Sequence, residues 1–315
     1  MSKVLVTPRS VTKGGHPSLD ALRDAGYEVV FCTPGVQPSE EELRELLPGC
    51  VGYLAGVERV SAAVLEAAPD LRVISRNGTG VDNIELEAAG RCGIQVCRAE
   101  GANARGVAEL AMGLLLALAR AIPQSNHAIS EGGWERYKGV ELSGRKLGVV
   151  GCGQIGRIVS RLARGFAMQV LAYDPYPSKD FALGDGFRYA SLEEIIEHAD
   201  AITLHCPPRA DGRPLFDAGS LERVKPGVLI INTARSGLVD GTALLQALQT
   251  GRVGGAAFDV FDKEPPGDEP LLRHPRVIAT PHVGGFTDES VDRAMYVAVD
   301  NLLAALKPSN WKVKI

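Results

Sequence analysis

Short apolar runs alternate with amphipathic stretches along the whole 315-residue chain. The short runs are rich in β-branched residues and are bounded by glycine, proline, asparagine or aspartate, which is typical of strands. The stretches between them are helical in pattern. This alternation from end to end predicts an α/β protein with parallel sheets whose faces are covered by helices.

The first hundred residues predict one α/β unit. Its expected strands are Lys3–Val6, Glu28–Phe31, Val51–Leu54, Arg72–Ser75 and Gly93–Val96. Its expected helices are Leu19–Gly26, Ser39–Leu47, Ser61–Ala67 and Ile84–Gly90.

A long helix, Asn103–Arg120, follows this unit, and Pro123 is expected to end its regular part. A loop, Glu131–Gly144, then leads into a second β/α series. The strands of this series are predicted at Lys146–Val150, Val170–Tyr173, Ala201–Leu204, Val228–Asn232, Gly254–Phe258 and Val277–Ala279. Its helices are predicted at Gln154–Phe166, Ser191–His198 and Asp240–Thr250, and one long helix, Thr287–Leu306, closes the chain.

Composition narrows the class of protein. Hydrophobic residues make up 45% of the chain and charged residues 23%, as in soluble globular proteins, and the net charge of -4 gives no basic surface for nucleic acid. The longest apolar run, Leu110–Ala119, is shorter than the roughly 20 residues that a membrane span needs, and the N-terminus lacks signal-peptide architecture. The six cysteines have no metal-ligand spacing, so we expect no metal and free thiols in a reducing cytoplasm.

A glycine-rich turn offers the first sign of chemistry. Residues Gly151 to Gly156 read GCGQIG, directly after a predicted buried strand and at the start of a predicted helix. Asp174 ends the next predicted strand, about 20 residues further on, as a dinucleotide site requires. The glycines let the backbone approach a pyrophosphate, and the carboxylate accepts hydrogen bonds from ribose hydroxyls. Because no arginine follows Asp174 closely, the pattern favours NAD over NADP.

Three polar residues follow late strands, where open α/β sheets bind ligands. They are Arg235 in NTARSGLVD, Glu264 in FDVFDKEPP and His282 in TPHVGG. Reduction of a 2-oxo acid needs a planar cation for the carboxylate, a proton donor for the carbonyl oxygen, and a carboxylate that orients and favours the imidazolium. Taken singly each residue is ordinary, but the three together would meet these needs.

In combination with Ser75–Asn83 and Gly101–Leu110, these segments resemble the D-isomer-specific 2-hydroxyacid dehydrogenase family, in its phosphoglycerate dehydrogenase-like branch. The resemblance implies two Rossmann-like, doubly wound parallel-sheet domains. A discontinuous, flavodoxin-like substrate-binding domain (1–98 and 286–315) would hold an inserted NAD-binding Rossmann domain (99–285). Because the sequence stops at Ile315, we expect the short form of the branch, without its regulatory domain.

The same resemblance assigns roles to residues. Arg235 would bind substrate, His282 would be the acid/base and Glu264 its partner. The NAD-binding residues would be Gly151, Gly153, Gln154, Ile155, Gly156, Asp174, His205, Cys206, Pro207, Thr233, Ala234, Asp259 and Gly284. Relatives usually pair through their cofactor domains, which implies a homodimer with the Asn103 helix and the Glu131–Gly144 loop near the partner.

The expected substrate is a small three-carbon 2-hydroxy or 2-oxo acid with a distal anionic group. The arginine that commonly holds the distal phosphate in this branch is replaced by Ala55. The residues that could bind substrate instead are Arg9, Ser10, Arg76, Asn77, Gly78, Thr79, Gly80 and, from the partner subunit, Arg136. Several arginines favour a phosphate, phosphonate or sulfonate tail. We therefore expect 3-phosphoglycerate and 3-phosphohydroxypyruvate first, with phosphonopyruvate, sulfopyruvate, glyoxylate or hydroxypyruvate as alternatives.

Two rival functions stay open on the same fold. An NAD(H)-sensing corepressor would keep the same Arg, Glu and His but would carry additional terminal segments for its partners. A formate dehydrogenase needs no proton donor, and in that family glutamine rather than glutamate is paired with the histidine, so Glu264 argues against it.

Overall fold

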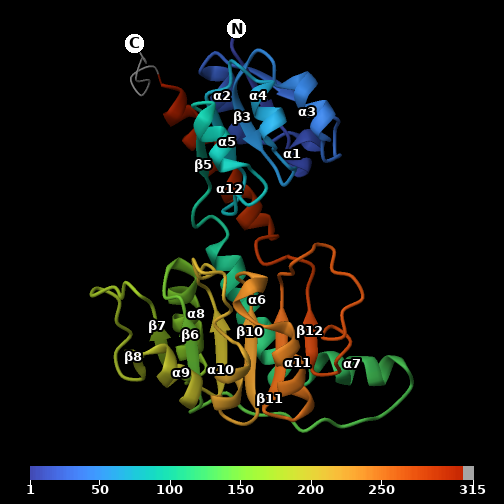
Figure 1. Ribbon diagram of the computed structural model, residues 1–315, viewed down its shortest axis with the longest axis vertical. Helices are drawn as coiled ribbons and strands as arrows, with labels where there is room; N and C mark the ends of the chain where they lie inside the picture. The colour runs from blue at the N-terminus through green and yellow to red at the C-terminus, as the bar shows by residue number, and fades with distance from the viewer. Residues whose placement is uncertain (308–315) are drawn as a thin grey trace. The chain divides into compact units, whose positions relative to one another are not determined.

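The computed structural model describes residues 1–307, which form two compact units (Figure 1). Unit 1 comprises Met1–Asn103 and the segment from Asp288 onward, and unit 2 comprises Ala104–Thr287. Unit 2 is thus inserted into unit 1, and the expected boundaries at residues 98 and 286 lie a few residues from these positions. The last part of the expected substrate-binding domain, residues 308–315, lies outside the described residues.

Unit 1 is built on a five-stranded parallel sheet with strand order β2-β1-β3-β4-β5, which is the flavodoxin-like order. The strands are β1 (Lys3–Val6), β2 (Glu28–Phe31), β3 (Cys50–Ala55), β4 (Val73–Arg76) and β5 (Gln95–Arg98). The helices are α1 (Arg9–Gly14), η1 (Pro17–Leu19), α2 (Asp20–Asp24), α3 (Glu40–Leu46), α4 (Ala62–Glu66), α5 (Leu86–Arg91) and α12 (Asp288–Leu306).

Strand residues in unit 1 alternate between two apolar layers, because successive side chains of a strand point to opposite faces. Leu5, Tyr53 and Ile74 pack in the layer that contains Leu43 and Leu47 around α3. Val4, Leu54 and Val73 pack in the other layer, which contains Leu302 and Met295 of α12. The C-terminal helix is therefore part of the core formed by the first hundred residues.

Unit 2 is built on a seven-stranded parallel sheet with order β12-β11-β10-β9-β6-β7-β8. Counted within the unit from β6, this is the Rossmann order 3-2-1-4-5-6 with one further strand at the edge. The strands are β6 (Lys146–Val150), β7 (Gln169–Tyr173), β8 (Phe187–Tyr189), β9 (Ala201–Leu204), β10 (Val228–Asn232), β11 (Val253–Phe258) and β12 (Val277–Ala279). The helices are α6 (Ala104–Ala119), α7 (Ile122–Ser130), α8 (Gln154–Gly165), α9 (Leu192–His198), α10 (Ala218–Arg223), η2 (Ser236–Leu238) and α11 (Gly241–Gln249).

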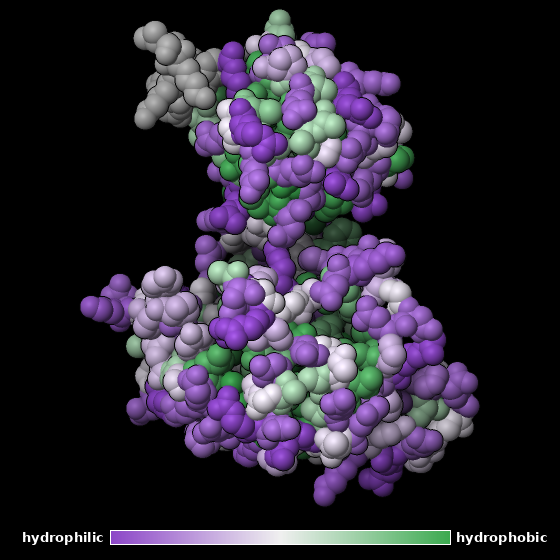
Figure 2. All heavy atoms as spheres, in the orientation of Figure 1, coloured by the Kyte–Doolittle hydropathy of each residue, from purple (hydrophilic) through white to green (hydrophobic). Residues whose placement is uncertain are grey.

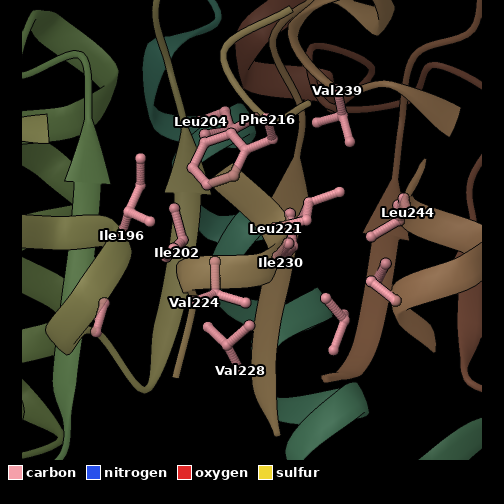
Figure 3. Packing of buried hydrophobic residues seen from close by; sticks show 14 of the residues in the cluster. Ile196, Ile202, Leu204, Phe216, Leu221, Val224, Val228, Ile230, Val239 and Leu244 are labelled. Carbon is pink, nitrogen blue, oxygen red and sulfur yellow. The ribbon is translucent and has the colours of Figure 1, made fainter. Parts of the chain in front are cut away.

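Both faces of this sheet are covered. Ile230 belongs to the layer that includes Leu221 of α10 and Leu244 of α11 (Figure 3). The next residue, Ile231, belongs to the opposite layer, with residues of α6 and α8. Apolar side chains fill these layers, and hydrophilic side chains cover most of the visible surface of each unit (Figure 2). The predicted α/β class, with its two doubly wound parallel sheets, is confirmed.

The structure adds elements that the sequence pattern did not assign. These elements are helices α1, α7 and α10 and strand β8. Pro123 lies in the first turn of α7 rather than after the end of a helix. Within residues 1–307, no single helix has the length and apolar character to cross a bilayer, and α6 and α7 reach that limit only when joined across their 63° bend.

Candidate active site

Most of the predicted site residues of unit 2 follow the carboxyl ends of adjacent strands. Gly151 follows β6, Asp174 follows β7, His205 follows β9, Thr233 follows β10 and Asp259 follows β11. Because all seven strands are parallel, these positions lie along one edge of the sheet. This edge is where open α/β sheets bind ligands, so the topology alone gathers residues that are far apart in the chain.

The glycine turn between β6 and α8 is packed too closely for side chains. A Cβ at Gly151 would lie 2.5 Å from the carbonyl oxygen of His205, and Gly151 has φ of +94°. A Cβ at Gly156 would overlap with the carbonyl oxygen of Gly151. At Gly153, by contrast, the space around a Cβ is open, so the first turn of α8 can be approached by a ligand. Backbone N–H groups at a helix N-terminus favour an anion such as a pyrophosphate.

The carboxylate of Asp174 is fixed to this turn. Its Oδ2 accepts the N–H of Cys152 at 2.8 Å, and its Oδ1 accepts the N–H of Tyr176 at 2.9 Å. Each carboxylate oxygen has a second lone-pair site that can accept a hydroxyl proton. The acid is therefore held in place where a ribose would need an acceptor.

The ends of β9 and β10 supply polar atoms without protein partners. Within the described residues, the buried Oγ1 of Thr233 and the buried Nδ1 of His205 make no hydrogen bond. Burial lowers the pKa of His205 to about 3 and raises the pKa of Cys206 to about 11, so both side chains stay neutral. Buried polar atoms are usually satisfied, and an orphan beside a glycine turn indicates a ligand that would complete it.

Asp259, at the end of β11, holds the loop that carries His282. The aspartate is almost fully buried, and its carboxylate accepts the N–H groups of Val283 and Gly284, both at 2.8 Å, and the hydroxyl of Thr280 at 2.6 Å. His282 lies between these anchor points with φ of +53°, a left-handed conformation that non-glycine residues rarely adopt. The anchored loop therefore sets the direction of the imidazole.

His282 and Glu264 form a pair in unit 2. The Nδ1 of His282 is 2.9 Å from both carboxylate oxygens of Glu264, and Oε1 of Glu264 also accepts the N–H of Phe261 at 3.2 Å. The side chains are 54% and 40% exposed, and such an open ion pair contributes little to stability. The pair matters for chemistry instead, because Glu264 occupies Nδ1 and leaves Nε2 as the ring nitrogen that can exchange a proton.

Arg235 lies just after β10 and is partly buried. Its backbone carbonyl accepts the side-chain N–H of the buried Asn232 at 2.8 Å, and its Nη1 donates to the carbonyl of Ala234 at 2.8 Å. These contacts hold the base of the guanidinium at the same sheet edge as the His282 loop.

The predicted substrate residues of unit 1 gather at the carboxyl edge of its own sheet. Arg9 and Ser10 begin α1 just after β1, and Arg76 ends β4. The backbone from Asn77 to Gly80 follows, and the N–H of Asn77 donates to Ala55 at 2.8 Å. Arg9 and Ser10 are exposed, whereas Arg76 is partly buried.

Arg136 is not brought to either edge within one chain. It lies in the exposed segment after α7, which leads to the amino end of β6, opposite the carboxyl edge of that sheet. The sequence predicts Asp259 as a cofactor contact, and the structure adds its hold on the His282 loop. The available signal was an acid directly after a buried strand, with two glycines following the histidine.

The residues of unit 2 fit a dinucleotide. The glycine turn would hold the pyrophosphate, Asp174 a ribose, and the orphaned Thr233 hydroxyl could donate to or accept from the cofactor. Among residues 1–307, no group of three metal-ligating side chains that could hold a metal ion occurs.

Comparison with known proteins also indicates a dinucleotide site. The family model for the NAD-binding domain of D-isomer specific 2-hydroxyacid dehydrogenases matches residues 112–284. The D-3-phosphoglycerate dehydrogenase of Archaeoglobus fulgidus is 39% identical over 287 residues, which are 90% of this chain and 54% of the relative. The human D-3-phosphoglycerate dehydrogenase is 42% identical over 275 residues, covering 86% of this chain and 51% of the relative. The chain thus spans about half the length of these relatives.

A solved structure is similar over nearly the whole chain. The crystal structure of the TT0316 protein from Thermus thermophilus has a TM-score of 0.85 and 36% sequence identity, and the match covers 96% of each chain. The predicted NAD cofactor agrees with the matched NAD-binding domain.

The glycine turn gives a direct test of cofactor binding. Gly156→Ala should weaken NADH binding about tenfold or more, because the added methyl group forces α8 away from the turn at a cost of about 1–3 kcal/mol. Gly165→Ala, at the other end of the same helix, meets no atom within 4 Å and should leave the affinity unchanged. Fluorescence titration with NADH measures both, and equal affinities in the two variants would contradict this account of the turn.

Proposed function

We propose that the chain, which belongs to the D-isomer specific 2-hydroxyacid dehydrogenase family, interconverts a small D-2-hydroxy acid and its 2-oxo acid with NAD. The observation that carries this proposal is the His282–Glu264 pair at 2.9 Å, at the same sheet edge as Arg235 and the glycine turn. This edge joins a proton donor, a carboxylate-binding cation and a dinucleotide site.

In the proposed reduction, the guanidinium of Arg235 binds the substrate carboxylate, which fixes the orientation of the 2-oxo group. Protonated His282 donates from Nε2 to the carbonyl oxygen, and Glu264, which contacts Nδ1, holds the plane of the imidazole. In the oxidation direction, His282 accepts the hydroxyl proton. NADH, when bound, supplies the hydride that reduces the carbonyl carbon.

The proposed substrate carries a distal anion and has three carbons, with 3-phosphoglycerate and 3-phosphohydroxypyruvate as the leading pair. The curated relatives named D-3-phosphoglycerate dehydrogenase support this choice. Arg76 at the end of β4 and Arg9 after β1, with β3 between these two strands, would supply cations for the distal group from unit 1. The loop Asn77–Gly80 would offer backbone N–H groups to the substrate carboxylate.

A panel of oxo acids tests the reaction and the substrate class together. With NADH, kcat/KM should be highest for 3-phosphohydroxypyruvate, lower for phosphonopyruvate and sulfopyruvate, and at least about tenfold lower for pyruvate, which lacks a charged tail. A preference for pyruvate or glyoxylate would remove the distal-anion proposal and keep the dehydrogenase. Binding of NADH without oxidation on any member of the panel would support the corepressor-like alternative instead.

A homodimer is the proposed assembly, formed through α7 and residues 131–144, which we call the arm. None of the residues of α7 is buried, and the arm exposes large apolar side chains, including Ile129 and Trp134, the latter 82% exposed. In Figure 1 α7 and the segment after it extend from the body of unit 2. Apolar groups gathered on a projecting segment indicate an interface.

The mass of the protein in solution tests whether the arm forms a dimer interface. The native chain of 33.4 kDa should elute at twice that mass in light-scattering chromatography, and Ile129→Glu combined with Trp134→Ala should yield monomers. Val57→Glu, at a comparably exposed apolar position in unit 1, should stay dimeric. A native monomer, or a variant that remains dimeric, would contradict the proposal.

A further inference from the structure

A buried glutamate at the carboxyl edge of unit 1 has no part in the mechanism above. Glu58 follows β3 by three residues, on the loop between β3 and α4, and is only 1% exposed. A buried ionisable group is costly unless it is well hydrogen-bonded, so its position requires a reason. A glutamate in a loop of this kind is ordinarily solvated.

Three donors converge on one oxygen of Glu58. Its Oε1 accepts the hydroxyl of Tyr53 at 2.5 Å, the backbone N–H of Gly56 at 2.8 Å and the hydroxyl of Thr7. An oxygen that accepts three hydrogen bonds is typical of a carboxylate, and donors of this kind stabilise its charge. Burial and the charge of Glu58 raise the pKa of Tyr53 well above its usual value, so the tyrosine stays a donor.

Arg76 is the cation next to this charge. It ends β4, and its Cα is the partner of Ala55 in the register with β3. Its Nη1 donates to the carbonyl of Asn77 at 2.5 Å, and its buried Nε has no acceptor within the described part of the chain. Burial lowers the pKa of Arg76, while the charges of Glu58 and Asp82 act in the opposite direction. In residues 1–307 no ion pair of 4.0 Å or less joins Arg76 and Glu58, so their charges interact over a longer distance at this sheet edge.

The backbone leaves room for both side chains. A Cβ at Gly56 would lie 2.7 Å from Oε2 of Glu58, and a Cβ at Gly78 would lie 2.7 Å from Nη1 of Arg76. A larger residue at Gly56 would displace the carboxylate of Glu58, and one at Gly78 would displace the guanidinium of Arg76. Beyond its bond to the carbonyl of Asn77, the guanidinium of Arg76 keeps further donors for a ligand.

We propose that Glu58 sets the charge preference of the substrate site, by opposing the attraction that Arg76 exerts on the distal group. This inference rests on the proposed function, in which Arg76 binds that group. The repulsion from Glu58 grows with the charge of the ligand, so it weakens binding of a doubly charged tail more than binding of a singly charged tail. Glu58 is a specificity-determining residue that acts through the local potential and makes no contact with substrate.

Neutralising Glu58 should change the ratio of the kcat/KM values for two substrates whose tails differ in charge. At pH 8 the phosphate tail of 3-phosphohydroxypyruvate is doubly charged and the sulfonate of sulfopyruvate singly charged. Glu58→Gln should raise the ratio of kcat/KM for the phosphate over the sulfonate substrate about threefold or more. Any general loosening of the loop affects both substrates and cancels in the ratio. An unchanged or lower ratio in the folded variant would overturn the proposal.

Two further variants separate charge from structure. Tyr53→Phe removes a donor to Glu58 but keeps the carboxylate, so the ratio should stay at the native value. Asp82→Asn removes a second acidic charge that acts on Arg76, at an exposed position, and should raise the ratio by a smaller factor. If Glu58→Gln does not fold, an unchanged ratio in Asp82→Asn would count against charge control.

Binding of simple anions keeps the test independent of turnover. Calorimetric titration of the full chain with sulfate and with methanesulfonate should show sulfate gaining affinity over methanesulfonate in Glu58→Gln, and Arg76→Gln should abolish that gain. If the native protein reduces no oxo acid yet shows this pattern, the proposed reaction fails and the charge preference stands. If neither anion responds to Glu58→Gln, the charge preference is wrong even where the reaction is right.

Discussion

The carboxylate of Asp259 accepts the N–H groups of Val283 and Gly284 and the hydroxyl of Thr280 while lying buried at the end of β11. These bonds tie the last strand of unit 2 to its neighbour through the loop that carries His282. They also offset the left-handed backbone of His282, which costs about 1–2 kcal/mol. Glu264 and His282 are 18 positions apart, so their pairing depends on contacts that join distant parts of the chain, and this anchor is one of them.

Buried or partly buried acids fulfil related tasks at three loops of the molecule. Asp174 fixes the glycine turn through the N–H of Cys152, and Glu58 accepts the N–H of Gly56 beyond β3. In each case a carboxylate exchanges hydration for backbone donors, and leaving such donors unpaired would cost about 1–3 kcal/mol each. The loops that need defined shapes are therefore held by charge-assisted hydrogen bonds rather than by apolar packing alone.

Much of the fold could be predicted because local pattern determines it. β1, β2, β6, β9, β10 and β12 have the expected bounds, since each is a short apolar run between turn residues. β8 was missed because none of its three residues is buried, so it has no apolar run to detect. α7 was missed because Pro123 terminates a helix in one position and begins one in another, and only the turn at Ala121, with φ of +49°, distinguishes the two.

The candidate site was only partly predictable. The glycine turn, Asp174, Arg235, Glu264 and His282 stand in recognisable local segments, and the topology brings them to one edge. The hold of Asp259 on Gly284, and the convergence of Thr7 and Tyr53 on Glu58, join residues with no shared local pattern. Such contacts depend on strand order and burial, and a lone acid after a strand does not identify its partners.

The central claim is that Glu264 positions His282 as the proton donor for the carbonyl oxygen. Single-turnover oxidation of NADH by the oxo acid, compared in the native protein and in Glu264→Gln, tests it directly. The account predicts a rate at least about tenfold lower in the variant, with unchanged affinity for NADH, because a neutral glutamine holds the imidazole less firmly than a carboxylate does. Equal rates in the two proteins would contradict it.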